Sequence, residues 1–245
     1  MLNGKKALVT GSSRGIGRAI ALGLAAEGCE LIIHGAGNTE KANEVKGIIE
    51  ANGGKATVIM ANLCIPEETE RLARAIEDVD ILVLNASLQI KEKWQDITRA
   101  HAVEQLECNF VSSLTLIGAA VENMKSKGWG RIVTIGSVQE AKPHPDMLVY
   151  SASKAAQTNM IRSLSVQLAE YGITVNNVAP GVIYTDRNVE ALSDKDYAAH
   201  VRSLIPVKFY GKPEDCVGTV KLLCSEDGRY ITGQSIYIDG GKSVL

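Results

Sequence analysis

A tyrosine and a lysine four residues apart, Tyr150 and Lys154, are the side chains of this 245-residue chain best suited to acid–base chemistry. No proline or glycine lies between them, and the apolar residues Ile161, Leu164 and Leu168 recur beyond them at helical spacings. In a helix the phenol and the ammonium share one face. We expect the ammonium to favour the phenolate and to lower the pKa of Tyr150 from about 10 towards about 7, where a phenol can act as a general acid and base.

A glycine-rich segment near the N-terminus, Thr10–Gly17, is suited to binding phosphate. It follows a short apolar run and opens a stretch with an apolar stripe. Its glycines, Gly11, Gly15 and Gly17, allow a tight turn and a close approach of the backbone to a ligand, although their spacing is G-x-x-x-G-x-G rather than G-x-G-x-x-G. A helix N-terminus adds free N–H groups and a positive dipole end. We interpret the segment as the pyrophosphate-binding turn of a dinucleotide site.

The end of the second predicted strand, His34–Asn38, carries no aspartate or glutamate. An acidic residue there would bind the adenosine ribose hydroxyls and repel a 2′-phosphate. Arg14, within the phosphate turn, is placed to contact such a phosphate, and Lys41 is a further candidate. The alternative is that both are solvated surface charges. The pattern favours NADP(H) over NAD(H).

Short apolar runs alternate with helical stretches along the chain. The predicted strands are Ala7–Thr10, Glu30–His34, Ala56–Met60, Ile81–Leu84, Ile132–Ile135, Thr174–Val178 and Ser235–Ile238. The predicted helices are the stripe of Ile16, Ile20 and Leu24 and residues 39–51, 66–78, 100–126, 151–171 and 213–225. Apolar strands that alternate with helices predict an open, doubly wound parallel sheet with helices on both faces. We expect one α/β domain, residues 1–245, with an irregular substrate loop at about 181–212 beside the carboxyl ends of the strands.

The composition excludes several classes of partner. Net charge is −2, without a basic block, which argues against nucleic acid or an anionic membrane. No apolar run approaches the roughly 18 residues of a membrane span, and the N-terminus lacks a signal-peptide pattern. The five cysteines form no C-x-x-C or Cys/His cluster, so we expect no metal site and reduced thiols in a cytoplasmic protein.

Taken together and in this order, the motifs resemble the short-chain dehydrogenase/reductase family over nearly the whole chain. The matching segments are the cofactor turn Thr10–Gly17, the segment Leu84–Ser87 after the fourth strand, Asn109, Ser137, Tyr150 and Lys154, the nicotinamide segment from Pro180 to Thr185, and the C-terminal Asp239–Gly241. Two positions depart from the family pattern: Ser87 replaces a glycine, and Asn62 stands where an aspartate is common. The resemblance implies a Rossmann-type fold and an NAD(P)-dependent oxidoreductase.

The resemblance also implies roles for individual residues. Ser137 would bind the substrate oxygen, and Tyr150 would exchange a proton with it. Lys154 would bind the nicotinamide ribose and lower the tyrosine pKa, while Asn109 would hold a water that relays protons. The implied cofactor contacts are Gly11, Ser13, Arg14, Gly15, Ile16, Gly17, Asn62, Leu63, Asn85, Ala86, Tyr150, Lys154, Pro180, Gly181, Ile183 and Thr185. Read singly, Ser137 is also typical of a turn at a strand end, and Asn109 of a bonded polar residue within a helix.

The substrate is the part of the function that the sequence indicates least sharply. The expected substrate-facing residues are Ser137, Gln139, His144 and Tyr150, with the stretch Lys142–Met147 and the polar residues Asp186, Arg187 and Asn188 nearby. A polar lining favours a small alcohol or carbonyl compound of the sugar or polyol type. The alternative is a 3-oxoacyl thioester, although the Gly-Asn-x-Gly-Gln run that its reductases usually carry is absent before Tyr150. A non-catalytic NADP-binding regulator is a third hypothesis. Family habit predicts a homotetramer, with residues 100–126 and 151–171 at the interface.

Overall fold

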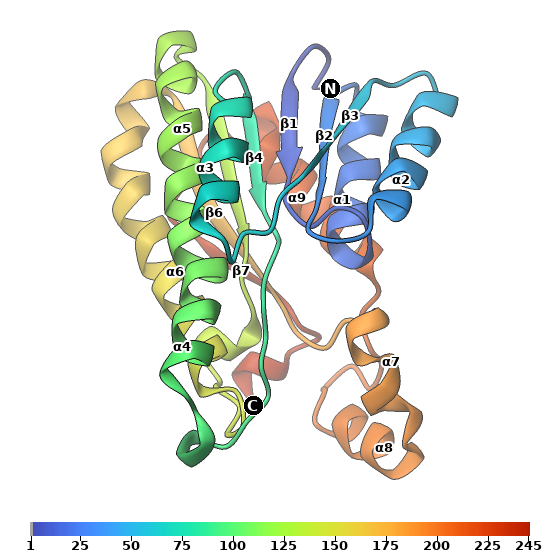
Figure 1. Cartoon of the computed structure of the whole chain (residues 1–245). Helices are drawn as coiled ribbons and strands as arrows, with labels where there is room; N and C mark the ends of the chain where they lie inside the picture. Colours follow the sequence, from blue (N-terminus) through green and yellow to red (C-terminus); the bar gives the residue numbers. More distant parts are fainter. Residues whose placement is uncertain (1) are drawn as a thin grey trace.

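A single parallel sheet organises the chain. The computed structural model describes residues 2–245, the side chains of Glu190 and Ala191 excepted, and in that part seven strands pair in the order β3-β2-β1-β4-β5-β6-β7 (Figure 1). They are β1 Lys6–Val9, β2 Glu30–Gly35, β3 Ala56–Met60, β4 Ile81–Leu84, β5 Gly130–Ile135, β6 Ile173–Pro180 and β7 Ser235–Ile238. Every pairing is parallel. The order reverses at β1, which lies between β2 and β4, and such a switch point is where open α/β sheets bind ligands.

Helices cover both faces of the sheet, as predicted. On one face lie α1 Gly15–Ala26, α2 Thr39–Ala51 and α9 Val217–Cys224; on the other lie α3 Pro66–Ala75, α4 Arg99–Leu106, α5 Ser112–Lys127 and α6 Leu148–Leu168 (Figure 1). Successive strand residues point to opposite faces, so Leu8 and Leu82 pack into one apolar cluster and Val9 and Val83 into the other. Apolar side chains on both faces of each strand therefore bury the sheet on both sides, which confirms the predicted fold class.

Several predicted helix boundaries differ from those in the structure, because local hydrogen bonds set where each helix begins and ends. The long helix predicted at 100–126 is α4 and α5 joined by a π-helical turn, Glu107–Val111, which contains Asn109. The helix predicted at 151–171 begins at Leu148, so Tyr150 lies in its first turn, and it ends in the 3₁₀ turn Ala169–Tyr171. The helix predicted at 66–78 stops at Ala75, and the one at 213–225 opens with the 3₁₀ turn Pro213–Cys216. Terminal turns of this kind are set by single bonds that periodicity does not encode.

The segment 181–212 is not the irregular loop that we expected. It contains two short helices, α7 Asp186–Ser193 and α8 Lys195–Ser203, which lie beyond the carboxyl ends of the strands (Figure 1). Asp194 caps α8, since its Oδ1 accepts hydrogen bonds from the backbone N–H groups of Asp196 and Tyr197 at 2.9 Å each. The first residues of α7 line the site described below.

The close packing of Gly17 against the phosphate turn makes a stability prediction. A Cβ at Gly17 would lie 2.4 Å from the Gly11 carbonyl oxygen and 2.5 Å from Asn85 Nδ2. Gly17→Ala should therefore lower the free energy of unfolding by about 1–3 kcal/mol. Gly47 in α2 is exposed with nothing within 4 Å of a Cβ, so Gly47→Ala should raise it by about 0.5–1 kcal/mol. Urea unfolding of both variants measures the difference, and equal effects would contradict this packing.

Candidate active site

A cavity of about 1000 Å³ opens at the carboxyl ends of the strands, at the switch point. Its wall comes from the glycine turn, the end of β2, the loop after β4, the end of β5, the start of α6 and the segment that follows β6. Of the residues predicted from the sequence, these line it: Gly11, Ser13, Arg14, Gly15, Ile16, Asn62, Leu63, Asn85, Ala86, Ser137, Gln139, His144, Tyr150, Pro180, Gly181, Ile183 and Thr185. Gly17, Asn109 and Lys154 lie behind this wall.

A buried histidine that the sequence did not single out for the site holds the glycine turn. Gly11, at φ +64°, donates its backbone N–H to His34 Nδ1 at 3.0 Å, and His34 Nε2 bonds the Ala61 carbonyl oxygen at 3.0 Å. Since Nδ1 accepts, Nε2 carries the hydrogen. Burial lowers the pKa of His34 to about 4, which keeps the ring neutral. Asn85 Nδ2 secures the other side of the turn by donating to the carbonyl oxygens of Thr10 and Gly11 at 2.9 and 3.2 Å.

The mouth of this turn fits a phosphorylated dinucleotide. Gly15, at φ +56°, opens α1, and a Cβ there would meet nothing closer than Thr185 Cγ2 at 3.6 Å, so the cradle is open. Arg14 is exposed beside it and pairs with no carboxylate among the described side chains. Lys41 instead forms an ion pair with Asp186 at 3.6 Å. The helix N-terminus and the unpaired guanidinium are suited to a pyrophosphate and a further phosphate.

Tyr150 and Lys154 share one face of α6, as predicted, and both are buried, with 6% and 1% exposure. The Lys154 ammonium lies 5.7 Å from the centroid of the Tyr150 ring. It donates to the Ile135 carbonyl oxygen at 2.9 Å and to Gln157 Oε1 at 3.0 Å. Ser137, also buried, stands at the end of β5, where its Oγ accepts from the Gln139 backbone N–H at 3.2 Å.

The pKa of Tyr150 is not lowered in this structure, contrary to our expectation. Burial raises it, and this outweighs the positive charge of Arg187 and the hydrogen bonds with Ser137, Ser87 and Arg187. Burial, with the nearby charge of Arg187, instead lowers the pKa of Lys154 to about 7. Both groups thus favour their neutral forms in the protein alone, because a desolvated charge is costly.

Asn109 holds the loop after β4 with its side chain. Its Oδ1 accepts from the Leu88 backbone N–H at 2.8 Å, and its Nδ2 donates to the Leu88 carbonyl oxygen at 2.9 Å and to Ser153 Oγ at 3.0 Å. Its backbone carbonyl accepts from Ser113 Oγ at 3.0 Å, which in turn accepts from Gln157 Nε2 at 3.0 Å. A buried series of hydrogen bonds therefore connects the Asn109 backbone with Lys154 through Ser113 and Gln157. The sequence feature that could have indicated it is Gln157, a polar residue one helical turn beyond Lys154.

The predicted substrate residues already have partners. Gln139 accepts from Ser151 Oγ at 2.9 Å and donates to Met147 Sδ at 3.2 Å, while His144 Nδ1 accepts from the Asp146 backbone N–H at 3.1 Å. Both still line the cavity. They shape the rim of the site more than they reach into it.

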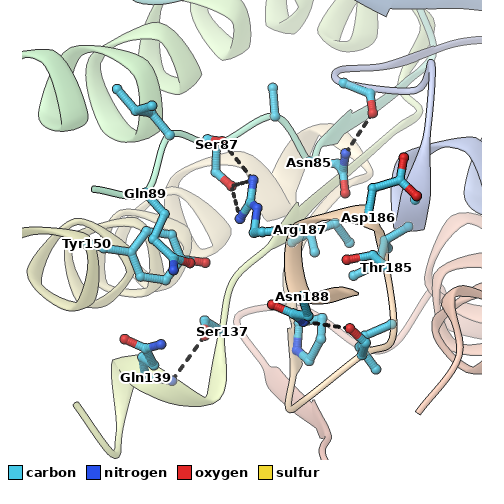
Figure 2. A pocket seen from close by; sticks show the side chains of 18 of the residues that line it. Asn85, Ser87, Gln89, Ser137, Gln139, Tyr150, Thr185, Asp186, Arg187 and Asn188 are labelled. Carbon is cyan, nitrogen blue, oxygen red and sulfur yellow. Dashed lines mark hydrogen bonds between the residues drawn. The ribbon is translucent and has the colours of Figure 1, made fainter. Parts of the chain in front are cut away.

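The two departures from the family pattern are accommodated. Ser87 is not among the described non-glycine residues with positive φ, so a serine fits there without strain. It contacts Arg187, which reaches across the cavity towards it (Figure 2). Asn62 Oδ1 accepts from the Cys64 backbone N–H at 3.1 Å, so the amide keeps the acceptor role of an aspartate.

Within residues 2–245, no group of three or more His, Cys, Asp or Glu is arranged to hold a metal ion, and no helix is long and apolar enough to cross a membrane. All five cysteines are free thiols, four of them buried.

The chain is similar to known oxidoreductases over its full length. A family model described as enoyl-(acyl carrier protein) reductase matches residues 11–243. The 3-oxoacyl-[acyl-carrier-protein] reductase FabG of Rickettsia felis is 37% identical over 249 residues, which cover 100% of this chain and 99% of that protein. A 3-oxoacyl (acyl-carrier-protein) reductase from Agrobacterium tumefaciens C58, solved with NADP bound, gives a TM-score of 0.93 at 37% identity over 98% of this chain and 94% of that one. A presumed gluconate dehydrogenase from Agrobacterium tumefaciens gives 0.94 at 33% identity over 100% and 98%.

The burial of Lys154 predicts how stability depends on pH without nucleotide. Its folded pKa of about 7 lies below the value of about 10.4 for an unfolded chain. Between these values the unfolded chain binds a proton that the folded protein lacks, so folding gains stability as pH rises, by up to about 1.4 kcal/mol per unit. Lys154→Met removes this dependence. The melting temperature of the wild type minus that of the variant should increase from about pH 7 to about pH 9. A constant difference would contradict the pKa shift.

Proposed function

We propose that this chain, which belongs to the short-chain dehydrogenase/reductase family, is an NADPH-dependent reductase of 3-oxoacyl thioesters. The observation that carries the proposal is the 37% identity to a 3-oxoacyl-[acyl-carrier-protein] reductase over essentially all of both chains. The sequence alone favoured a sugar or polyol, because residues near Tyr150 are polar. The relatives favour the alternative that we had kept, the thioester.

The geometry supports a simple division of labour in carbonyl reduction. The substrate oxygen lies between Ser137 Oγ and the Tyr150 hydroxyl, which are buried at the end of β5 and in the first turn of α6. Bound NADPH supplies the hydride that adds to the carbonyl carbon. Tyr150 gives its phenolic proton to the oxygen, and Ser137 keeps that oxygen in line by a hydrogen bond. The product is an alcohol, and the reverse direction uses the tyrosine as base.

Lys154 has two tasks in this proposal. Its ammonium binds the nicotinamide ribose hydroxyls, which add acceptors to the two that Ile135 and Gln157 provide. A charged partner favours the ammonium form, and the ammonium in turn stabilises the phenolate that Tyr150 becomes after proton transfer. The series of hydrogen bonds from Gln157 through Ser113 to the Asn109 backbone carbonyl fixes Gln157 so that its Oε1 faces the ammonium.

The proposed cofactor is NADP(H). The cradle at Gly15 takes the pyrophosphate, and Arg14 binds the 2′-phosphate. The exposed residues 36–38, which follow β2, include no acidic side chain that would repel this phosphate. The relative from Agrobacterium tumefaciens C58 was solved with NADP bound.

We also propose a homotetramer in the cytoplasm. Exposed apolar side chains of Val103, Leu106, Val111 and Leu114 follow α4, the π-helical turn and α5, within the segment that the sequence assigned to an interface. A second copy that covers these side chains removes them from water. Free cysteines suit a reducing compartment.

A second candidate function is oxidation or reduction of a sugar acid. It is favoured by the presumed gluconate dehydrogenase with a TM-score of 0.94 and by the cationic side chain of Arg187 within the cavity. The same four residues, Asn109, Ser137, Tyr150 and Lys154, serve either substrate.

Turnover of an acetoacetyl thioester tests the proposed function. We expect NADPH-dependent reduction, followed by NADPH absorbance, and a loss of about 10²–10⁴-fold in kcat for Tyr150→Phe, because the variant lacks the proton donor. NADPH affinity, measured by fluorescence titration, should stay within about twofold, because a general acid acts on the substrate oxygen. Absence of thioester reduction, with NADPH bound and a keto-sugar acid reduced, would overturn the thioester in favour of the second candidate.

The cofactor preference depends on Arg14. Arg14→Ala should weaken NADPH binding about tenfold, because it removes a charge-assisted hydrogen bond to the 2′-phosphate, and should change NADH binding little. Lys41→Ala is the matched control: Lys41 is paired with Asp186, so its loss should cost less. Equal weakening of NADPH and NADH by Arg14→Ala would show that Arg14 does not read the 2′-phosphate.

A further inference from the structure

A guanidinium lies inside the cavity beside the proposed proton donor. Arg187, in the first turn of α7, points from the segment after β6 across to the loop after β4 (Figure 2). It donates to the Ser87 carbonyl oxygen at 2.9 Å and to Ser87 Oγ at 3.2 and 3.3 Å. Its charge reaches both Tyr150 and Lys154, since it acts to lower the pKa of each. Arg187 therefore lies beside the Tyr150 hydroxyl that, in the proposed function, binds the substrate oxygen.

This positive charge has no counter-charge among the described side chains. The ion pairs of that part of the chain do not include Arg187, and its sequence neighbour Asp186 pairs with Lys41. The groups that it bonds, the Ser87 carbonyl and hydroxyl and the Tyr150 hydroxyl, are neutral acceptors. The guanidinium has five N–H donors in a planar fork that matches a carboxylate. Its positive charge therefore remains available to an anionic ligand.

The cavity lining is rich in basic side chains although the chain carries a net charge of −2. Lys142 and Lys242 line the cavity together with Arg187, and among the lining side chains that the structure describes Asp186 is the one acid. Burial, and next the charge of Lys142, lowers the pKa of Lys242. A cluster of like charges costs stability unless a ligand offsets it. The 2′-phosphate of NADP would account for Arg14, and Asp186 pairs with Lys41. Neither accounts for the charge beside Tyr150.

We propose that Arg187 binds a carboxylate of the substrate, so that the enzyme prefers oxo acids and hydroxy acids whose carboxylate lies a few bonds from the reacting carbon. The inference rests on the proposed function only in requiring that Tyr150 be the proton donor. A 3-oxoacyl thioester offers Arg187 a neutral carbonyl oxygen at this distance, whereas a free 3-oxo acid or a sugar acid offers a full charge. Within the same carbonyl–alcohol reaction, the proposal therefore favours the second candidate function, on a sugar acid, over the thioester.

Two matched pairs of substrates test the proposal with NADPH. The pairs are acetoacetate with acetoacetamide, and 5-oxogluconate with the neutral keto-sugar L-sorbose; each pair differs in whether a carboxylate is present. The wild type should prefer the charged member in kcat/KM by about tenfold or more. Arg187→Met should reduce that preference about 10–100-fold, towards one, and Arg187→Lys should restore part of it, since a lysine keeps the charge without the fork.

Controls separate this role from others on the same wall. Lys142→Met removes a lysine at the exposed rim, and we expect it to change the preference by less than about threefold, because an exposed charge is screened. NADPH affinity and melting temperature of Arg187→Met, measured in parallel, report cofactor binding and folding. A fall in NADPH affinity without a change in substrate preference would overturn the proposal and assign Arg187 to the cofactor.

The remaining outcomes are also decisive. Carboxylate recognition would be overturned if the wild type did not prefer the charged member in either pair. It would also be overturned if the wild type turned over none of the four compounds. Reduction of an acetoacetyl thioester in that case would leave the proposed thioester function standing. Conversely, reduction of the acids without the thioester would support Arg187 and contradict the thioester function.

Discussion

The buried ammonium of Lys154 is the constraint on which the rest of the site depends. A charge removed from water must find polar partners, and here both direct partners are neutral, the Ile135 carbonyl oxygen and Gln157 Oε1. Ile135 is the last residue of β5, and Gln157 lies in α6, the helix of Lys154, one turn beyond it. The sheet and α6 must therefore meet in one register for the ammonium to be held. Because neutral partners compensate only partly for the lost hydration, burial lowers the pKa of Lys154 to about 7.

The same packing underlies the proposed coupling of acid–base chemistry to a bound ligand. Tyr150, buried against Lys154, has its pKa raised by desolvation in the protein alone. A ligand that brings hydroxyl acceptors to Lys154 favours the ammonium, and the ammonium then favours the phenolate. Ser137 and Arg187 add hydrogen bonds on the side that faces the cavity. Proton transfer is in this way coupled to occupancy, which limits side reactions of an unfilled site.

The fold could be predicted because local and global signals agree. Strands apolar on both faces, such as Ile81–Leu84, indicated a sheet buried on both sides, and the alternation with helices indicated parallel pairing. The helices α7 and α8 were missed, since each is short and depends on bonds such as the Asp194 cap rather than on a long apolar stripe. The π-helical turn at Asn109 was missed for a similar reason: one extra residue per turn leaves no mark in the periodicity.

The sequence predicted which residues lie together where their spacing is local, as in the glycine turn and in Tyr150 with Lys154. It missed contacts between residues distant in sequence. His34 reaches the glycine turn, and Arg187 reaches Ser87, only because strand order brings them together. The direction of the pKa shift of Tyr150 was wrong for a related reason, since burial is set by tertiary packing and spacing within a helix does not report it.

The number of protons taken up when NADPH binds tests the central claim, that Lys154 is neutral in the open site and charged in the complete one. Titration calorimetry at about pH 8, in two buffers with different ionisation enthalpies, gives this number. The proton uptake of Lys154→Met, measured in the same way, is the baseline to be subtracted, because it contains the protons taken up by the nucleotide phosphate and by other groups. The account predicts that the wild type takes up more protons than the variant, by up to about one per site. Equal uptake would contradict it, because Lys154 would then keep a single protonation state throughout.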